Sequence, residues 1–294
     1  MKRAALVVLL VVLGIAAVMR YMNLDTLFYR SWQLNSRAMP EGSLDLGRYA
    51  VDIEARVVEG LDDDLSALTY NRERNSLFAV INGTPLVVEL DLEGRLLRQI
   101  RVENTKDMEG ITHVSGNRYV IAEERSQRLL LVDIADDAES IDVSTVPSLQ
   151  LALDAGDNKG FEGVSWDPAG KRLLVVKERD PMRLLSVEGF VDAAEGMTQI
   201  RVSELRREMS SLFMTDLSSL NQHVPSGHLL LLSDESHMLV EYDAANQPVS
   251  MMGLWRDMSG LSDTVPQAEG VAIDSQGRIF IVSEPNLFYR FSSR

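Results

Sequence analysis

The repeat unit of this chain is clearest between residues 160 and 179, where the sequence is GFEGVSWDPAGKRLLVVKER. An acid, Glu162, follows an apolar residue and precedes a glycine. A short strand then leads to a turn at Pro168, and the apolar run Leu173–Val176 leads to a second acid, Glu178. Two short apolar segments around a turn rich in Pro and Gly are typical of an antiparallel hairpin.

The same unit occurs five times along the chain. Aligned on Glu162, the copies carry Ser66, Glu109, Glu162, Ser218 and Glu269, and they recur every 43 to 56 residues. Repeats of about 40–50 residues with several short strands each are typical of β-propeller blades. The second strand of each copy is a dense apolar run, which indicates a strand buried on both faces. We therefore predict an all-β fold, a five-bladed β-propeller of four-stranded antiparallel blades.

The last repeat is one strand short, because it ends at Phe291, just before the chain does. Residues 47–56 alternate like a strand but have no partner of their own. We predict that this N-terminal strand completes the last blade and closes the ring, which removes an exposed sheet edge. An insert, Ser203–Phe213, has a capping serine and helical spacing and predicts a helix between the third and fourth blades.

Residues 4–19 form an unbroken apolar run with basic residues on both sides. The run is close to the length of about 17–25 residues that a transmembrane helix needs. We favour an uncleaved anchor over a cleaved signal peptide, because the residues around Ala16 are a poor match to a cleavage site. The basic N-terminus remains on the cytoplasmic side in either case.

These features predict three segments and a location. The segments are an anchor or signal segment (1–22), a juxtamembrane connector (23–46) and the propeller domain (47–294). The expected location is the inner membrane, crossed once, with the propeller in the periplasm. The alternative is a secreted or periplasmic protein released after signal cleavage.

Composition excludes several classes of function. The net charge is −15, from 44 acids against 29 bases, which opposes nucleic-acid binding. There is no cysteine, so disulfides and a thioether lipid anchor are excluded. Nucleophile, phosphate-binding and dinucleotide motifs are absent from the sequence, and catalytic residues are not identified.

The repeated acids predict a metal site. In a propeller, the loop before each first strand and the hairpin after each second strand lie on the same face. The acids at the start of the first strands and the acids after the second strands are therefore expected at one channel mouth. They are Glu109, Glu162, Glu269, Glu124, Glu178, Asp234 and Glu284. Clustered carboxylates repel one another unless a cation compensates them, and an all-oxygen ligand set favours calcium. The alternative is structural: each Glu before a Gly hydrogen-bonds to backbone N–H groups of the next blade.

Four stretches resemble the SdiA-regulated (YjiK-like) family of bacterial proteins: Asp64–Asn71, Glu109–Thr112, Ala122–Leu129 and Phe161–Val164. The similarity runs from about residue 48 to 294. It implies a five-bladed propeller distantly related to NHL repeats, a bound calcium ion and a secreted or membrane-associated location, and the family has no established reaction. Because Ser66 and Ser218 replace the acid, we expect an off-centre site built from the second, third and fifth blades.

Two functions fit these observations. The first is a non-enzymatic, envelope-tethered module that binds calcium and presents its loops to a protein or a small-molecule ligand. The second is a calcium-dependent hydrolase, similar to propeller lactonases or phosphatases, in which the ion polarises a carbonyl or phosphoryl oxygen. Glu124, Glu178 or Asp234 would then be the base. A quorum-related sensor follows only from the family's name.

Overall fold

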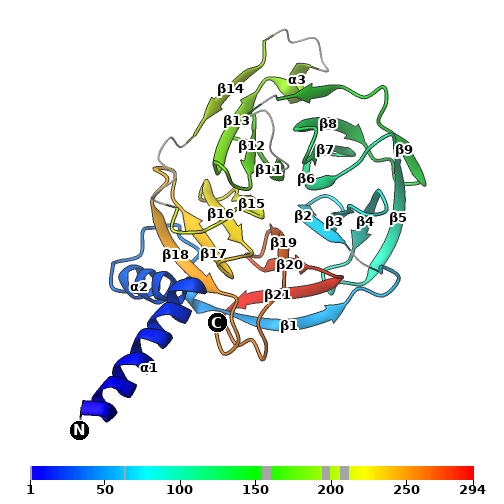
Figure 1. The fold of residues 1–294 in the computed structure, drawn as a ribbon. Helices are drawn as coiled ribbons and strands as arrows, with labels where there is room; N and C mark the ends of the chain where they lie inside the picture. Colours follow the sequence, from blue (N-terminus) through cyan, green and yellow to red (C-terminus); the bar gives the residue numbers. More distant parts are fainter. Residues whose placement is uncertain (1, 63, 152, 154–159, 194–198, 206–211) are drawn as a thin grey trace.

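The computed structural model describes residues 2–62, 64–151, 153, 160–193, 199–205 and 212–294. Five β-sheets form a ring in which the first strands of successive blades pack on one another around the axis (Figure 1). The predicted five-bladed propeller is confirmed. In chain order the strands are β1 (Tyr49–Val57), β2 (Leu65–Asn71), β3 (Ser76–Ile81), β4 (Leu86–Leu90), β5 (Leu96–Glu103), β6 (Met108–Ser115), β7 (Arg118–Glu123), β8 (Arg128–Asp133), β9 (Ser140–Asp142), β10 (Ser148–Gln150), β11 (Phe161–Asp167), β12 (Arg172–Lys177), β13 (Arg183–Glu188), β14 (Arg201–Glu204), β15 (Ser219–His223), β16 (His228–Ser233), β17 (Met238–Tyr242), β18 (Pro248–Gly253), β19 (Ala268–Ile273), β20 (Ile279–Ser283) and β21 (Leu287–Ser293).

All five blades are antiparallel sheets, and one extra strand is added to the first blade. Their strand orders from the axis outward are β2-β3-β4-β5, β6-β7-β8-β10, β11-β12-β13-β14, β15-β16-β17-β18 and β19-β20-β21-β1. The short strand β9 pairs in parallel with β5 of the first blade, with Ser140 opposite Arg101. The chain leaving β8 therefore crosses to the neighbouring blade before it returns as β10 and completes its own.

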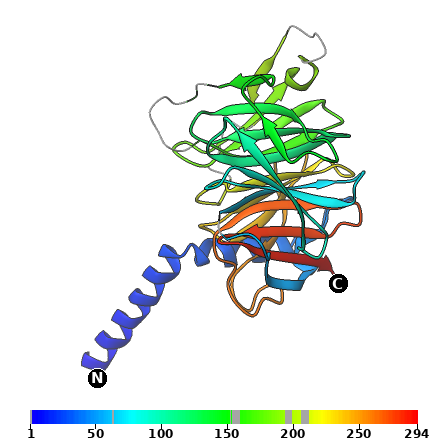
Figure 2. The same cartoon turned by 90° about the vertical axis from the view of Figure 1, so that its right-hand side faces the viewer.

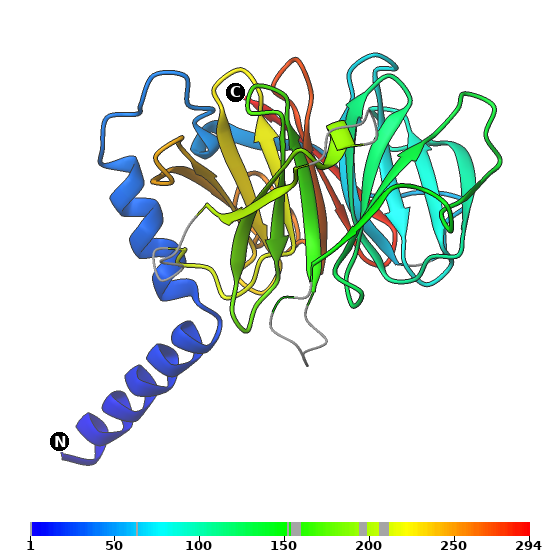
Figure 3. The ribbon, with the colours of Figure 1, turned by 90° about the horizontal axis from the view of Figure 1, so that it is seen from above.

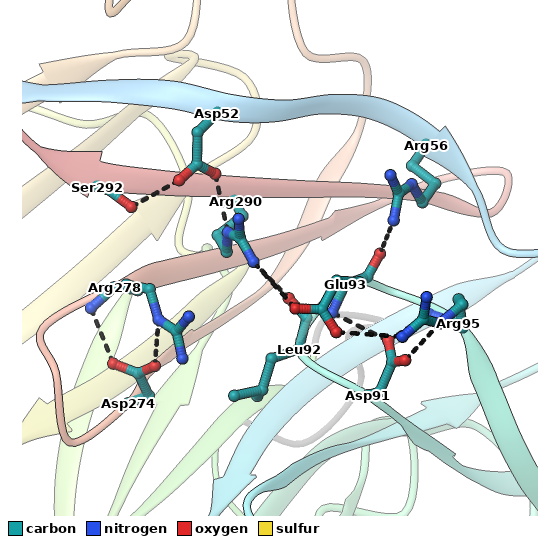
Figure 4. Close-up of polar contacts among 10 residues, drawn as sticks. All are labelled: Asp52, Arg56, Asp91, Leu92, Glu93, Arg95, Asp274, Arg278, Arg290 and Ser292. Carbon is teal, nitrogen blue, oxygen red and sulfur yellow. Dashed lines mark hydrogen bonds and ion pairs between the residues drawn. The ribbon is translucent and has the colours of Figure 1, made fainter.

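The ring closes through β1, as predicted. This strand pairs antiparallel with β21, and Val51 lies opposite Phe291. Arg290 of β21 reinforces the closure, since its Nε donates to Asp52 of β1 at 2.8 Å and its Nη1 donates to the Leu92 carbonyl of the first blade at 3.2 Å (Figure 4). One side chain thus joins the first and last parts of the propeller.

The hydrophobic core is divided among the five blade-to-blade interfaces. Every residue of β3, β16 and β20 is buried, because each middle strand has a neighbouring blade on both sides. The first interface, for example, joins Phe78 and Val80 of β3 to Ile121 of β7 and Leu130 of β8. The outer strand β5 instead alternates between buried and exposed side chains towards its end, as expected for a half-solvated edge.

The helices lie outside the ring. They are α1 (Lys2–Tyr21), α2 (Leu24–Asn35), the 3₁₀ turn η1 (Leu46–Arg48) and α3 (Phe190–Ala193). Helix α1 projects away from the disc, and its segment Arg3–Tyr21 has a mean hydropathy of 2.4 and contains no buried residue (Figures 2 and 3). It is therefore long and apolar enough to cross a membrane. Helix α2 packs along β18 of the fourth blade.

The predicted helix at Ser203–Phe213 is wrong at its start. Ser203 and Glu204 belong to β14, where they pair with Ser186 and Leu185 of β13. Sheet pairing overrides the capping signal of the serine at this position. Residues 206–211 lie outside the described residues.

Candidate metal centre at the channel mouth

The first acid of each full repeat is held at the start of an innermost strand. Glu109, Glu162 and Glu269 are the second residues of β6, β11 and β19, and each is followed by glycine. A Cβ atom added to Gly163 would lie 3.0 Å from the Leu220 backbone nitrogen of the next blade. Gly110 and Gly270 meet the next blade's backbone in the same way. The glycines therefore let adjacent first strands approach closely, which brings the acids before them towards one axis.

Three hydrogen bonds between adjacent first strands are accepted by hydroxyl groups three residues after the acid position. The Thr112 Oγ1 accepts a hydrogen bond from the Trp166 N–H of the next blade at 2.9 Å. Thr69 and Ser165 accept equivalent bonds at 3.1 and 3.0 Å. None of the hydrogen bonds among the described residues reaches the carboxylate of Glu162 or Glu269. The structural alternative for these two acids, a bond to the next blade's backbone, is therefore not observed in the described part of the chain.

The second acids lie beside the first ones because the backbone connects them. The Glu124 N–H donates to the Asp107 carbonyl at 2.8 Å, and the Glu284 N–H donates to the Gln267 carbonyl at 3.0 Å. In the third blade the Glu178 N–H donates to the Gly160 carbonyl at 3.3 Å. Each hairpin acid is thus held next to the residue two positions before its blade's first acid.

Gly160 holds two of these acids around Glu162. Its carbonyl accepts from Glu178, and its N–H donates to the Glu124 Oε1 at 3.3 Å. A Cβ atom at this position would lie 1.9 Å from the Glu124 carbonyl oxygen, so only glycine fits. As a result, Glu124, Glu162 and Glu178 each place one carboxylate oxygen within 4.8 Å of the others.

Glu162 is the centre of the acidic mouth. Burial raises its pKa well above the ordinary value, and the negative charges of Glu109, Glu124, Glu178 and Glu269 raise it further. All three first acids therefore lie close enough to influence one another. The predicted convergence on one mouth agrees with this geometry, whereas the role of each acid as a ligand stays a prediction.

Glu109 lies at the mouth where the first and second blades meet. Burial raises its pKa to about 8, a hydrogen bond from Ser66 opposes the shift, and the charges of Glu124 and Asp64 add to it. Its carboxylate also accepts a hydrogen bond from the Asn82 amide. The serine and the asparagine stand at the acid positions of the first blade, so that blade supplies neutral oxygen and nitrogen groups instead of charge.

Glu269 lies near acids of the fourth and fifth blades. Burial raises its pKa to about 9, and the charges of Asp234, Glu109 and Glu284 contribute. Asp234 accepts the Ala268 N–H at 3.1 Å, which fixes its carboxylate beside the start of β19. Of the seven predicted acids, three therefore have carboxylate oxygens within 4.8 Å of one another, and Glu269 and Asp234 lie outside that group.

Sequence reasoning missed three aspartates at this mouth. Asp64, Asp107 and Asp216 stand two residues before the aligned Ser or Glu of their blades. Asp216 is buried and accepts hydrogen bonds from Ser233 and from the Asp234 N–H, and burial raises its pKa to about 6. The signal was an aspartate at the same offset in three of the five repeats, which alignment on Glu162 alone did not use.

Few cationic side chains in the described part of the chain contact the carboxylates of the mouth. Arg179 pairs with Glu178 at 2.5 Å and also with Glu235, and Arg125 pairs with Asp107 at 2.9 Å. Lys177 is fully buried, but its Nζ donates to the Arg179 carbonyl at 2.7 Å. Among the described residues no cationic side chain contacts Glu162. A largely desolvated carboxylate surrounded by others is neutralised most readily by a proton or a metal ion.

The donor set fits a hard divalent cation. The group Glu124, Glu162 and Glu178 offers only carboxylate oxygens, with no His or Cys among its ligand atoms. Carboxylates on hairpins and strand ends of different blades make a flexible all-oxygen cage, which suits calcium better than zinc. The residues present therefore fit the ion that the sequence predicted.

A polar cleft lies beside the acids on the same face. It has a volume of about 670 Å³ and is lined by residues of both signs, including Lys106, Asp107, Arg125 and Arg128. Arg125 directly follows Glu124 in the β7–β8 hairpin. A molecule in this cleft would lie next to the acidic mouth.

Comparison with known proteins gives a family and a fold. A family model described as SdiA-regulated matches residues 41–292. The structure is similar to that of a luciferin-regenerating enzyme, with a TM-score of 0.52 and 12% identity over 83% of this chain and 95% of that one. It is also similar to glutaminyl cyclase of Myxococcus xanthus, with a TM-score of 0.52 and 14% identity over 83% of this chain and 95% of that one. At such identities the likeness shows the fold alone.

Proposed function

Because the chain belongs to the SdiA-regulated family of β-propellers, we propose that it is an envelope-tethered, calcium-binding interaction module. The observation that carries the proposal is the group of three carboxylates from two neighbouring blades, with oxygens within 4.8 Å of one another. Glu162 is the half-buried central member of this group, and Glu124 and Glu178 flank it.

Glu124, Glu162 and Glu178 would hold the ion. Bound calcium would supply positive charge beside Glu162, which no cationic side chain of the described residues contacts. The protein's own part is to fix the two hairpin acids through Gly160 and to hold Glu162 at the start of β11. Because the acids come from the second and third blades, an ion there would also join these blades.

The ligand would bind beside the ion. The cleft lined by Asp107, Arg125 and Arg128 offers both donors and acceptors on the acidic face. Arg125 is largely exposed and pairs with Asp107, so it is available to an acidic group of a ligand. These features support recognition of a polar small molecule or a protein segment that contains carboxylates.

The tether would be α1. Its apolar segment Arg3–Tyr21 has the length and hydropathy of a membrane span, and no part of it packs on the propeller. With the basic N-terminus on the cytoplasmic side, the propeller would face the periplasm. The alternative, release by signal cleavage, leaves the calcium site unchanged.

Calcium titration by calorimetry of the detergent-solubilised full chain tests the proposal. The wild-type protein is expected to bind one ion. Glu162→Gln should weaken binding at least 100-fold, because it removes the central charge while keeping the shape. Glu139→Gln, the same change at an exposed site before β9, should bind as the wild type does. Equal affinities of the wild type and Glu162→Gln would refute the site, and so would a wild type that takes up no calcium.

A further inference from the structure

The exposed aromatic residues of this protein are all in one short segment. Tyr21, Phe28, Tyr29 and Trp32 are exposed, whereas every other Phe, Tyr and Trp of the chain is buried or half-buried. The segment joins α1 to the propeller. Aromatic side chains exposed together on a soluble protein mark a surface that contacts something else.

Helix α2 has two apolar faces. Leu27 and Leu34 are 2% and 4% exposed and pack with Met251 of β18 against the fourth blade. On the other face Phe28, Tyr29 and Trp32 are 51%, 57% and 69% exposed. No other side chain described between residues 24 and 34 is exposed. A solvated helix face is normally polar, so this face is expected to be covered.

A membrane is the surface that this face of α2 would meet, because α2 follows the predicted membrane span α1. Helix α1 ends at Tyr21 and α2 begins at Leu24, and the chain turns sharply at Asn23, which has a left-handed φ of 54°. Figure 3 shows that α2 does not continue α1 but bends away from its end along the side of the propeller. An interfacial helix that follows a membrane span requires this kind of bend.

The charge of the segment favours the same partner. Residues 20–37 contain three arginines and one aspartate, a net charge of +2 in a chain of net charge −15. Tyr and Trp are enriched at the level of lipid headgroups, and basic residues bind anionic lipids.

We propose that α2 is an interfacial helix whose Phe28, Tyr29 and Trp32 insert into the headgroup layer of a membrane that contains anionic lipid. This inference rests on the proposed tether and goes beyond it, because it fixes the orientation of the propeller. The Asn23 amide donates to the Ser236 hydroxyl at 3.1 Å, and Ser236 lies in the β16–β17 hairpin, as does Asp234. The acidic mouth is therefore on the side of the disc from which the anchor leaves.

Because the chain contains no cysteine, single-cysteine labelling tests the proposal. Nitroxide labels at Trp32→Cys and Tyr29→Cys report on α2. A label at Val224→Cys, an exposed apolar position in the β15–β16 turn at the opposite end of the channel, is the matched control. The full chain is reconstituted into vesicles of phosphatidylethanolamine and phosphatidylglycerol. Label relaxation is measured with oxygen, which concentrates in lipid, and with a water-soluble nickel chelate.

Labels at positions 29 and 32 should collide more with oxygen than with the nickel chelate, and the label at 224 should show the reverse. Labels at 29 and 32 that behave like the label at 224 in vesicle-bound protein overturn the interfacial helix and leave the tether intact. Protection of positions 29 and 32 from both relaxers, together with a dimeric mass, assigns this face to a second copy of the chain and also overturns the proposal. Protein that does not remain bound to the vesicles overturns the tether as well.

Discussion

Replacing one acid of the mouth should change how stability depends on pH in the metal-free protein. Burial and neighbouring charges raise the pKa of Glu269 to about 9, whereas an unfolded chain has an ordinary glutamate pKa of about 4.5. Between these values the folded protein binds a proton that the unfolded chain does not. The contribution of Glu269 to stability is therefore fully present below pH 4.5 and is lost as the pH rises towards 9.

The change in the free energy of unfolding follows from the shift in the pKa of Glu269. Each pH unit in this window costs about 1.4 kcal/mol, so raising the pH from 5.5 to 8.5 lowers the free energy of unfolding by up to about 4 kcal/mol through this group. Because the charge of Glu109 contributes to the raised pKa of Glu269, and the pKa of Glu109 is itself raised, one substitution removes only part of the total. Glu269→Gln should therefore lessen the fall by about 2–4 kcal/mol.

The assay is urea unfolding of the full chain in detergent with a chelator present, at several pH values between 5.5 and 8.5. Glu139→Gln, at an exposed position before β9, is the control and should follow the wild-type profile. The reasoning is refuted if wild-type stability does not fall with rising pH. A Glu269→Gln profile with the wild-type slope would also refute it.

Three further predictions concern the ion and the ring. Calcium should raise the melting temperature more at pH 8.5 than at pH 6, since protons and the ion compete for the same carboxylates; a rise independent of pH in a thermal scan would contradict this. Gly163→Ala should lower the free energy of unfolding by about 1–3 kcal/mol, because the new Cβ would lie 3.0 Å from the Leu220 nitrogen; unchanged urea stability would show that the blades can move apart. Arg290→Met should cost about 1–3 kcal/mol and expose the N-terminal strand to protease earlier, because the side chain joins Asp52 to the first blade; wild-type protease resistance would argue against this closure.

The blade pattern was predictable because it depends on local residues. Runs such as Leu173–Val176 are apolar at every position, and only a strand covered on both faces needs that. The closing strand followed from counting: the last repeat lacked an outer strand, and residues 47–56 had no partner. Both conclusions follow from the hydrophobic pattern and the repeat length, and they require no knowledge of long-range contacts.

The acidic mouth was predictable in outline, since its residues occupy equivalent positions in repeated units. The close approach of Glu124, Glu162 and Glu178 was not, because it depends on how Gly160 holds the two hairpin acids. The aspartates at 64 and 216 were missed because their blades carry serine at the aligned position. Likewise, the crossing of β9 to the first blade and the packing of α2 on β18 are set by tertiary contacts that leave no period in the sequence.

The central claim is that a cation binds among the carboxylates of the second and third blades. The most direct measurement is an anomalous difference map from crystals of the protein grown with calcium. The account predicts a peak bounded by the carboxylates of Glu124, Glu162 and Glu178. A peak at another place in the propeller, or an empty mouth at saturating calcium, would contradict it.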